Sequence, residues 1–82
     1  MTNQEQLRCF VIDAIRHLGG SASLADINRT VWERHLTEIQ SMGEDVLWTW
    51  QHLIASSRKM LVDDKKISRS IAEGITYYTL AK

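Results

Sequence analysis

The last third of the chain most constrains its fold, because a segment with helical periodicity runs directly into two segments with strand periodicity. Residues 66–71 and 75–80 each follow a period of two, and residues 72–74, Ala-Glu-Gly, lie between them. Two such runs around a short glycine-containing turn are typical of a β-hairpin. Along the second run Tyr78 and Leu80 share one face, and we expect that face to be buried.

The segment before the hairpin has the spacing of one long amphipathic helix. We expect it to begin near Asp45 and to end near Leu61, a length of roughly 25 Å at about 1.5 Å per residue. Its buried face is predicted to consist of Val46, Leu47, Trp50, Leu53, Ile54, Met60 and Leu61. A helix of this length can lie along the major groove of duplex DNA.

Two further helices are predicted upstream. The first has apolar residues at the spacing of one helix face, and Gly19-Gly20 supplies its stop. These apolar residues are Leu7, Phe10, Val11, Ala14, Ile15 and Leu18. Residues 21–23 are either a connector or a three-residue strand. Ser23 with Asp26 has the spacing of a helix N-cap, so a second helix is expected from there to about Arg34.

Residues 35–45 lose the helical period. Leu36, Ile39 and Met42 recur every third residue, so we expect a loop that can contain one short helical turn. With the other elements, this order predicts a mainly α fold with a small β-hairpin. This order of elements is typical of a winged helix-turn-helix, with three helices and a two- or three-stranded antiparallel wing. Residues 1–82 are long enough for one small core and are expected to form a single domain.

The inventory of reactive side chains gives no support for an enzyme. The three histidines are far apart in sequence, no metal-ligand spacing is present, and Gly19-Gly20 closes a helix rather than opening a phosphate-binding loop. We therefore expect no catalytic residue, no metal and no cofactor. The chain has no apolar run long enough to cross a membrane. Its single cysteine, Cys9, fits a reducing compartment, so we expect a cytoplasmic protein.

The charge of the chain is balanced overall but unevenly distributed. Ten basic and ten acidic residues give a formal net charge of zero. Residues 1–45 hold four of the basic and seven of the acidic residues, a net −3, whereas residues 46–82 hold six and three, a net +3. The electric field of a polyanion such as DNA would orient the molecule with its positively charged C-terminal half toward the polyanion. The same distribution is also compatible with ordinary solvated charges.

The outward side of the third predicted helix carries small hydrogen-bonding residues and cations. Such side chains can meet base edges or phosphates without holding the helix out of the groove. Cations on the first arm of the hairpin would then reach the flanking backbone of double-stranded DNA. The predicted DNA-binding residues are Thr49, Gln51, His52, Ser56, Arg58, Lys59, Lys65, Lys66 and Arg69. A solvated helix face is the alternative, because surface helices share much of this composition.

Trp48 points outward on the same helix, although tryptophan is rarely left in water. Either it packs under the predicted loop at residues 36–44, or it anchors a partner. Ile12 lies off the buried face of the first helix and is the second candidate for such a surface. Both residues support an alternative function, in which the domain mediates protein–protein contacts or forms a homodimer without binding DNA.

The chain resembles the winged-helix domains attached to Mrr-type restriction endonucleases. The matching residues are LGGSASLADI at 18–27, Trp50, Leu53, Arg58 and Leu61 in the third helix, and residues 74–80. The resemblance covers most of the chain. It implies a DNA-recognition module that is fused to a larger protein such as a nuclease or stands alone as a transcriptional regulator. The residues that it implies are Thr49, His52, Ser56 and Lys59 in the major groove and Lys66 and Arg69 on the wing.

Overall fold

The structure is a computed structural model that describes residues 3–81. In chain order its elements are α1 (Asn3–His17), β1 (Ser21–Ser23), α2 (Leu24–Ser41), α3 (Glu44–Asp63), β2 (Ile67–Ala72) and β3 (Ile75–Leu80). The predicted long helix is confirmed as α3, one residue longer at its start and two at its end. Both predicted hairpin strands are confirmed as β2 and β3.

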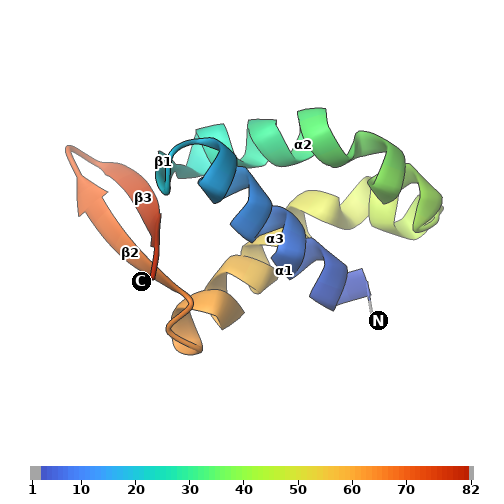
Figure 1. Cartoon of the computed structure of the whole chain (residues 1–82). Coiled ribbons are helices and arrows are strands. Elements are labelled where there is room, and N and C mark those ends of the chain that lie inside the picture. Colours follow the sequence, from blue (N-terminus) through green and yellow to red (C-terminus); the bar gives the residue numbers. More distant parts are fainter. Residues whose placement is uncertain (1–2, 82) are drawn as a thin grey trace.

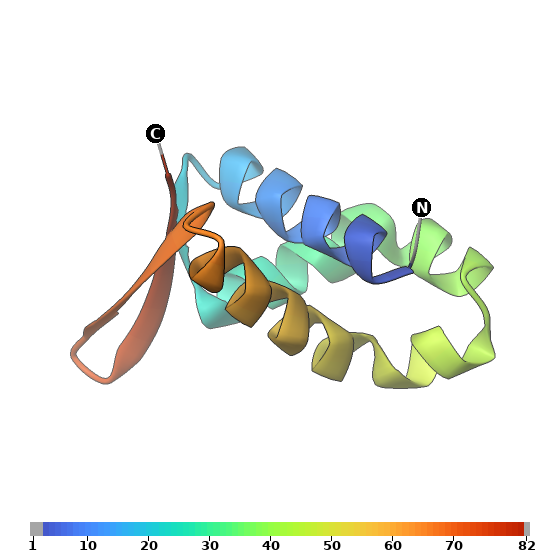
Figure 2. The ribbon, with the colours of Figure 1, turned by 90° about the horizontal axis from the view of Figure 1, so that it is seen from below.

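The sheet lies at one end of the three helices, and α3 leads directly into its hairpin (Figures 1 and 2). The strand order is β1-β3-β2, and both neighbouring pairs are antiparallel. β3 is therefore the central strand, while β1 and β2 form the two edges. Three helices with a small three-stranded wing are the predicted winged helix-turn-helix layout.

One hydrophobic core lies between the helices and the inner face of the sheet. Its fully buried apolar side chains are Leu7, Val11, Ala14, Ile15, Ile27, Val31, Ile39 and Ile54. Tyr78 is 8 % exposed and Leu80 packs against the same core, so the predicted inner face of the hairpin is confirmed. Each large apolar side chain buried in this way contributes about 1.5–3 kcal/mol. The core therefore fixes α3 against the wing.

The prediction of a loop at residues 35–45 is wrong, because α2 continues through most of this segment. The helix bends at His35, whose φ of −123° and ψ of 15° are not helical, and this bend is where the helical period is lost. Ile39 in the second half is fully buried, so the three-residue spacing in the sequence belongs to a real helical continuation. Gly43, with a φ of 116°, then joins α2 to α3 in a conformation that glycine readily adopts.

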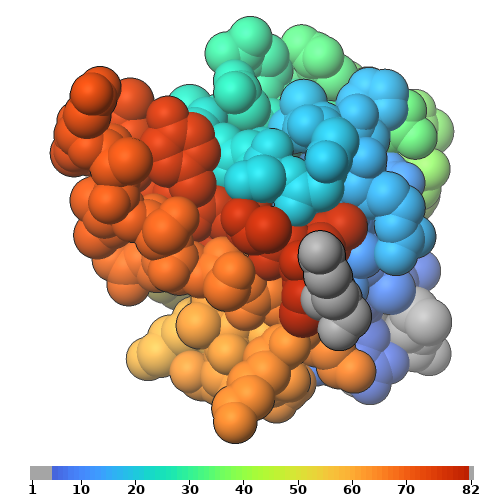
Figure 3. All heavy atoms as spheres, turned by 60° about the vertical axis from the view of Figure 1, so that its left-hand side comes forward, coloured from blue at the N-terminus to red at the C-terminus, as the bar shows by residue number. Residues whose placement is uncertain are grey.

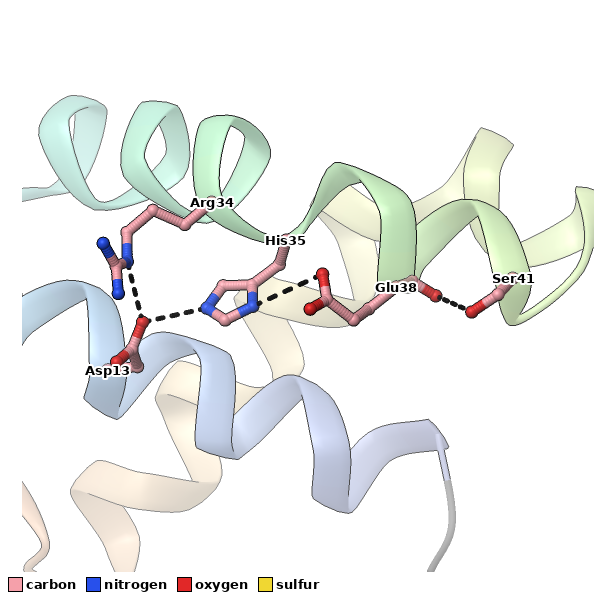
Figure 4. A network of polar contacts seen from close by, with 5 residues as sticks. All are labelled: Asp13, Arg34, His35, Glu38 and Ser41. Carbon is pink, nitrogen blue, oxygen red and sulfur yellow. Dashed lines mark hydrogen bonds and ion pairs between the residues drawn. The ribbon is translucent and has the colours of Figure 1, made fainter.

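Side chains from α1 hold the bend in α2 (Figure 4). Asp13 Oδ2 lies 3.0 Å from Arg34 Nε and 2.9 Å from His35 Nε2. The His35 ring also stacks on Phe10, with 4.1 Å between the ring centres. Burial raises the pKa of the Asp13 carboxyl, but hydrogen bonds and charge from Arg34 and His35 outweigh it and leave this pKa below its usual value. The bend is thus fixed by contacts between residues more than twenty positions apart.

The wing closes through a two-residue turn at Glu73 and Gly74. Both residues have positive φ angles, 53° and 78°, and Ala72 pairs with Ile75 across them. Positive φ at both central positions defines a type I′ turn, whose twist matches that of the two strands. The turn therefore fixes the register of β2 against β3.

Residues 21–23 form a short strand, which decides between the two alternatives that the sequence left open. In β1, Ser21 pairs with Thr79 of β3, and their hydroxyl oxygens lie 2.9 Å apart. Ser23 then caps α2, because its Oγ accepts a hydrogen bond from the backbone N–H of Asp26 at 3.3 Å. The start of α2 is therefore anchored to the sheet.

Candidate nucleic-acid interface

The outward side of α3 carries four of the predicted residues at the surface. Thr49, His52 and Lys59 are exposed, and Ser56 is partly exposed. The Thr49 hydroxyl donates a hydrogen bond to the carbonyl of Asp45 at 2.6 Å, so it is left to act mainly as an acceptor. The 20 residues of α3 span about 30 Å. This face has the length and access that a groove-binding helix needs.

Arg58, also predicted as a DNA contact, lies inside the protein. It is 8 % exposed, and its Nη1 donates a hydrogen bond to Asn28 Oδ1 on α2 at 2.9 Å. Its guanidinium carbon lies 5.6 Å from the ring centre of Tyr78 on β3. The acceptor and the ring face offset part of the desolvation of the buried cation. Arg58 therefore joins α2, α3 and β3 and is not presented to a ligand, whereas Met60, expected on the buried face, is 36 % exposed.

Lys59 of α3 and Arg69 of β2 line the same hollow, which has a volume of about 310 Å³. Its other lining residues are Ala55, Val62, Asp63 and Tyr78. Within residues 3–81 neither cation forms an ion pair. Asp63 opposes the two cations with one negative charge. The space-filling view shows the hairpin projecting above the C-terminal part of α3 at this end of the molecule (Figure 3).

Lys66 lines a different hollow, of about 350 Å³, on the side of α1. That hollow also contains Arg8 and Asp64, which lie 3.8 Å apart as an ion pair. Lys65 is exposed in the turn before β2, with a φ of 62°. Side chains an odd number of residues apart point to opposite faces of a strand, which separates Lys66 from Arg69. The predicted wing cations therefore form two groups rather than one patch.

A third hollow extends the outer face of α3 toward α2. It has a volume of about 310 Å³ and is lined by Asn28, Arg29, Trp32, Trp50 and Gln51. The rings of Trp32 and Trp50 stack with their centres 5.0 Å apart, and Trp32 packs against the core. Gln51 was predicted here, but Asn28 and Arg29 were not. The sequence did contain a signal for them, because Arg29 and Asn28 lie three and four residues before Trp32 and so on the same side of α2.

Trp48 is 78 % exposed, so of the two alternatives that the sequence left open, packing under residues 36–44 is excluded. That segment continues α2 as a helix, and its buried residue Ile39 points into the core instead of covering Trp48. Glu44 and Asp45, one turn earlier on α3, are also exposed. Ile12 is partly buried and packs against the core, so it offers less free surface than Trp48.

Comparison with family models, curated proteins and solved structures gives no match. The resemblance to Mrr-type winged-helix domains therefore stays a prediction, and the geometry of the chain carries the argument on function. Among residues 3–81 no helix is long and apolar enough to cross a membrane. The same residues include no group of three or more His, Cys, Asp or Glu side chains placed to hold a metal ion.

Proposed function

We propose that this domain binds double-stranded DNA, with α3 in the major groove and the β2–β3 hairpin against the phosphate backbone. The observation that carries the proposal is the pairing of Lys59 and Arg69 at one hollow where helix and wing meet. Two cations without an ion pair in the described chain, held on separate rigid elements, suit consecutive phosphates.

The outer face of α3 supplies the groups that would meet base edges. His52 and Gln51 are exposed and can donate or accept hydrogen bonds in the groove. Ser56 is partly exposed, and Thr49 offers its oxygen as an acceptor. Since none of these side chains is an arginine, we expect modest sequence preference, with most of the affinity coming from phosphate contacts.

Arg58 would not contact DNA but would position the residues that do. Its contacts with Asn28 and Tyr78 fix α3 relative to α2 and the wing, so they set the spacing between Lys59 and Arg69. Lys65 and Lys66 are kept as outer phosphate contacts, because both are exposed and carry no ion pair among the described residues. Their effect should be smaller than that of the Lys59 and Arg69 pair.

The proposal is tested by the binding of a fluorescent random-sequence duplex at low salt. Lys59→Ala should weaken binding, by roughly tenfold if one phosphate contact worth about 1.4 kcal/mol is lost. Asp63→Asn should strengthen binding, because it removes the negative charge that faces the two cations. Arg16→Ala, which removes an exposed charge on α1, is the control and should have little effect. If Lys59→Ala and Arg16→Ala weaken binding equally, the affinity comes from general charge attraction and not from the proposed surface.

The exposure of Trp48 favours a second candidate function, the binding of a protein partner. An exposed tryptophan beside Glu44 and Asp45 suits a partner segment that carries a cation and an apolar side chain. Trp48→Ser tests whether the exposed tryptophan belongs to the DNA-binding surface or lies outside it, where it is free for a partner. If DNA binding is the function, this variant keeps its affinity for duplex, whereas a DNA affinity that falls as far as that of Lys59→Ala would place Trp48 in the binding surface.

The cellular role follows the same proposal. The domain would serve as a transcriptional regulator or as the targeting module of a larger protein such as a restriction nuclease. We propose a cytoplasmic location, in which the exposed, unpaired thiol of Cys9 would remain reduced.

A further inference from the structure

We propose that the free edge of β2 pairs with β2 of a second copy of this chain, joining the two wings into one continuous antiparallel sheet. This inference does not rest on DNA binding, although Arg69 belongs to both proposed surfaces. It rests on the position of β2 in the sheet, on the direction of its peptide groups, and on the residues along its edge.

β2 leaves one row of peptide groups unpaired. It is an edge strand, since the order is β1-β3-β2. The backbone N–H of Ala81 bonds to the carbonyl of Lys66 at 2.9 Å, and bonded positions then alternate along the ladder. The peptide groups of Ile67, Arg69 and Ile71 therefore face away from β3, and no backbone hydrogen bond satisfies them within residues 3–81.

This edge lacks the features that usually prevent edge pairing. It has six residues, no proline, no bulge in its register with β3, and a single charge, at Arg69. Ile71 is 62 % exposed, although edge strands are commonly protected by charges, by shortness or by a covering element. β1, the opposite edge, is protected by its length of only three residues. Only β2 is thus suited to add a strand.

A hollow beside β2 provides space for the second strand. It has a volume of about 510 Å³ and is lined by Val62, Arg69, Ser70 and Ile71. Arg69 and Ser70 lie on opposite faces of the strand, so the hollow runs along the edge itself. An isoleucine from the incoming strand would cover Val62 of α3, which is partly buried and packed against the core.

Charge selects the register of the pair. If Arg69 lay opposite Arg69 of the second copy, like charges would meet, which is unfavourable in cross-strand pairs. A shift by two residues places Arg69 opposite Ile71 of the second copy. The two arginines then become diagonal neighbours instead of direct partners, and Glu73 of the second copy, of opposite charge, is the other diagonal neighbour of Arg69. In this register Arg69 and Ile71 use their outward peptide groups, and Ser70 lies opposite itself on the two-fold axis.

The first test is sedimentation of the natural chain over a range of concentrations, from about 10 µM to about 1 mM, where weak dimers dissociate. We expect a monomer–dimer equilibrium. Ile71→Lys should raise the dissociation constant at least about tenfold, because it places a lysine opposite arginine twice per dimer. Ile75→Lys is the matched control, since Ile75 is also exposed at the wing tip but lies on β3. It should leave the dissociation constant unchanged, as should Trp48→Ser.

The second test fixes the register by disulfide trapping in a Cys9→Ser background. At a non-hydrogen-bonded pair the Cα atoms are about 4.5 Å apart, within the range of a disulfide. Ser70→Cys should therefore give a covalent dimer on mild oxidation. Ser68→Cys, also exposed and on the same face, would lie roughly 13 Å from its copy and should not form a disulfide.

Three results would overturn the pairing. The first is a natural chain that remains monomeric over the whole concentration range. The second is a dimer that survives Ile71→Lys with its fold intact by circular dichroism, or one that is lost on Trp48→Ser or Ile75→Lys. The third is a Ser68→Cys variant that crosslinks as fast as Ser70→Cys.

Discussion

The guanidinium of Arg58 donates a hydrogen bond to Asn28 Oδ1 across 2.9 Å and so links α3 to the first half of α2. Because Arg58 is buried and Asn28 is partly buried, this bond is partly shielded from water. Together with the apolar core, it holds α3 in the orientation that leaves Thr49, His52 and Lys59 outside. The same contact explains why Arg58, a cation in the C-terminal half of the proposed recognition helix, is absent from the proposed DNA surface.

Removal of the Asn28 acceptor should destabilise the fold. Asn28→Ala would leave a buried cation with fewer partners, and we expect the free energy of unfolding to fall by about 1–3 kcal/mol. Asn28→Asp keeps an acceptor and adds a negative charge, so it should retain most of the stability. Urea unfolding followed by circular dichroism measures both. Equal losses for the two variants would mean that the hydrogen bond is not the cause.

The acid stability of the fold should depend on Asp13. Its pKa is lower in the folded chain than its ordinary value of 3.8, so the charged carboxylate stabilises the fold. That contribution is complete above the ordinary pKa and disappears as the pH falls through the lower folded value. Asp13→Asn should flatten the loss of unfolding free energy between about pH 5 and pH 2. Glu33→Gln, the same change of charge at an exposed site on α2, is the control and should preserve the slope.

Truncation of the two tryptophans on α3 should have very different effects on the stability of the fold. Trp50 is 9 % exposed and stacks on Trp32, so Trp50→Ala should cost about 3–5 kcal/mol or prevent folding. Trp48→Ala should change the free energy of unfolding by less than about 0.5 kcal/mol. Urea titration gives both values. A large loss for Trp48→Ala would show that this side chain is covered by protein rather than by solvent.

The hairpin turn offers a stabilising substitution. Glu73 holds a φ of 53°, a left-handed conformation that costs roughly 1 kcal/mol for most side chains but less for asparagine. Glu73→Asn creates the Asn-Gly pair that type I′ turns favour. We expect the melting temperature to rise by up to about 4–8 °C, as for 1 kcal/mol in a domain of this size. Gly74→Ala, at a φ of 78°, should lower it.

The helices and the hairpin could be predicted from the sequence because their signals are local. Apolar spacing marked α1 and α3, and two alternating runs around Glu73-Gly74 marked the wing. The second half of α2 could not be predicted in the same way. Its bend at His35 depends on Asp13, twenty-two positions away, and no local pattern carries that contact.

The candidate site was only partly visible for the same reason. Helical spacing placed Thr49, His52 and Lys59 correctly on the surface, but it could not show that Asn28 and Tyr78 enclose Arg58. The separation of Lys66 from Arg69 follows from strand geometry, since an odd spacing puts two side chains on opposite faces. The sequence therefore contained that signal. That Lys59 and Arg69 line the same hollow could not be predicted, because it depends on how β2 packs against α3.

The salt dependence of duplex binding is the sharpest test of whether Lys59 and Arg69 contact phosphates. The slope of the logarithm of affinity against the logarithm of salt concentration counts phosphate contacts, at about one unit for each. We expect measurable binding at low salt and a slope that falls by about two units in Lys59→Ala/Arg69→Ala. We expect no change of slope in the Arg16→Ala control. An unchanged slope in the double variant, or no binding of the natural chain at the lowest salt, would contradict the proposal.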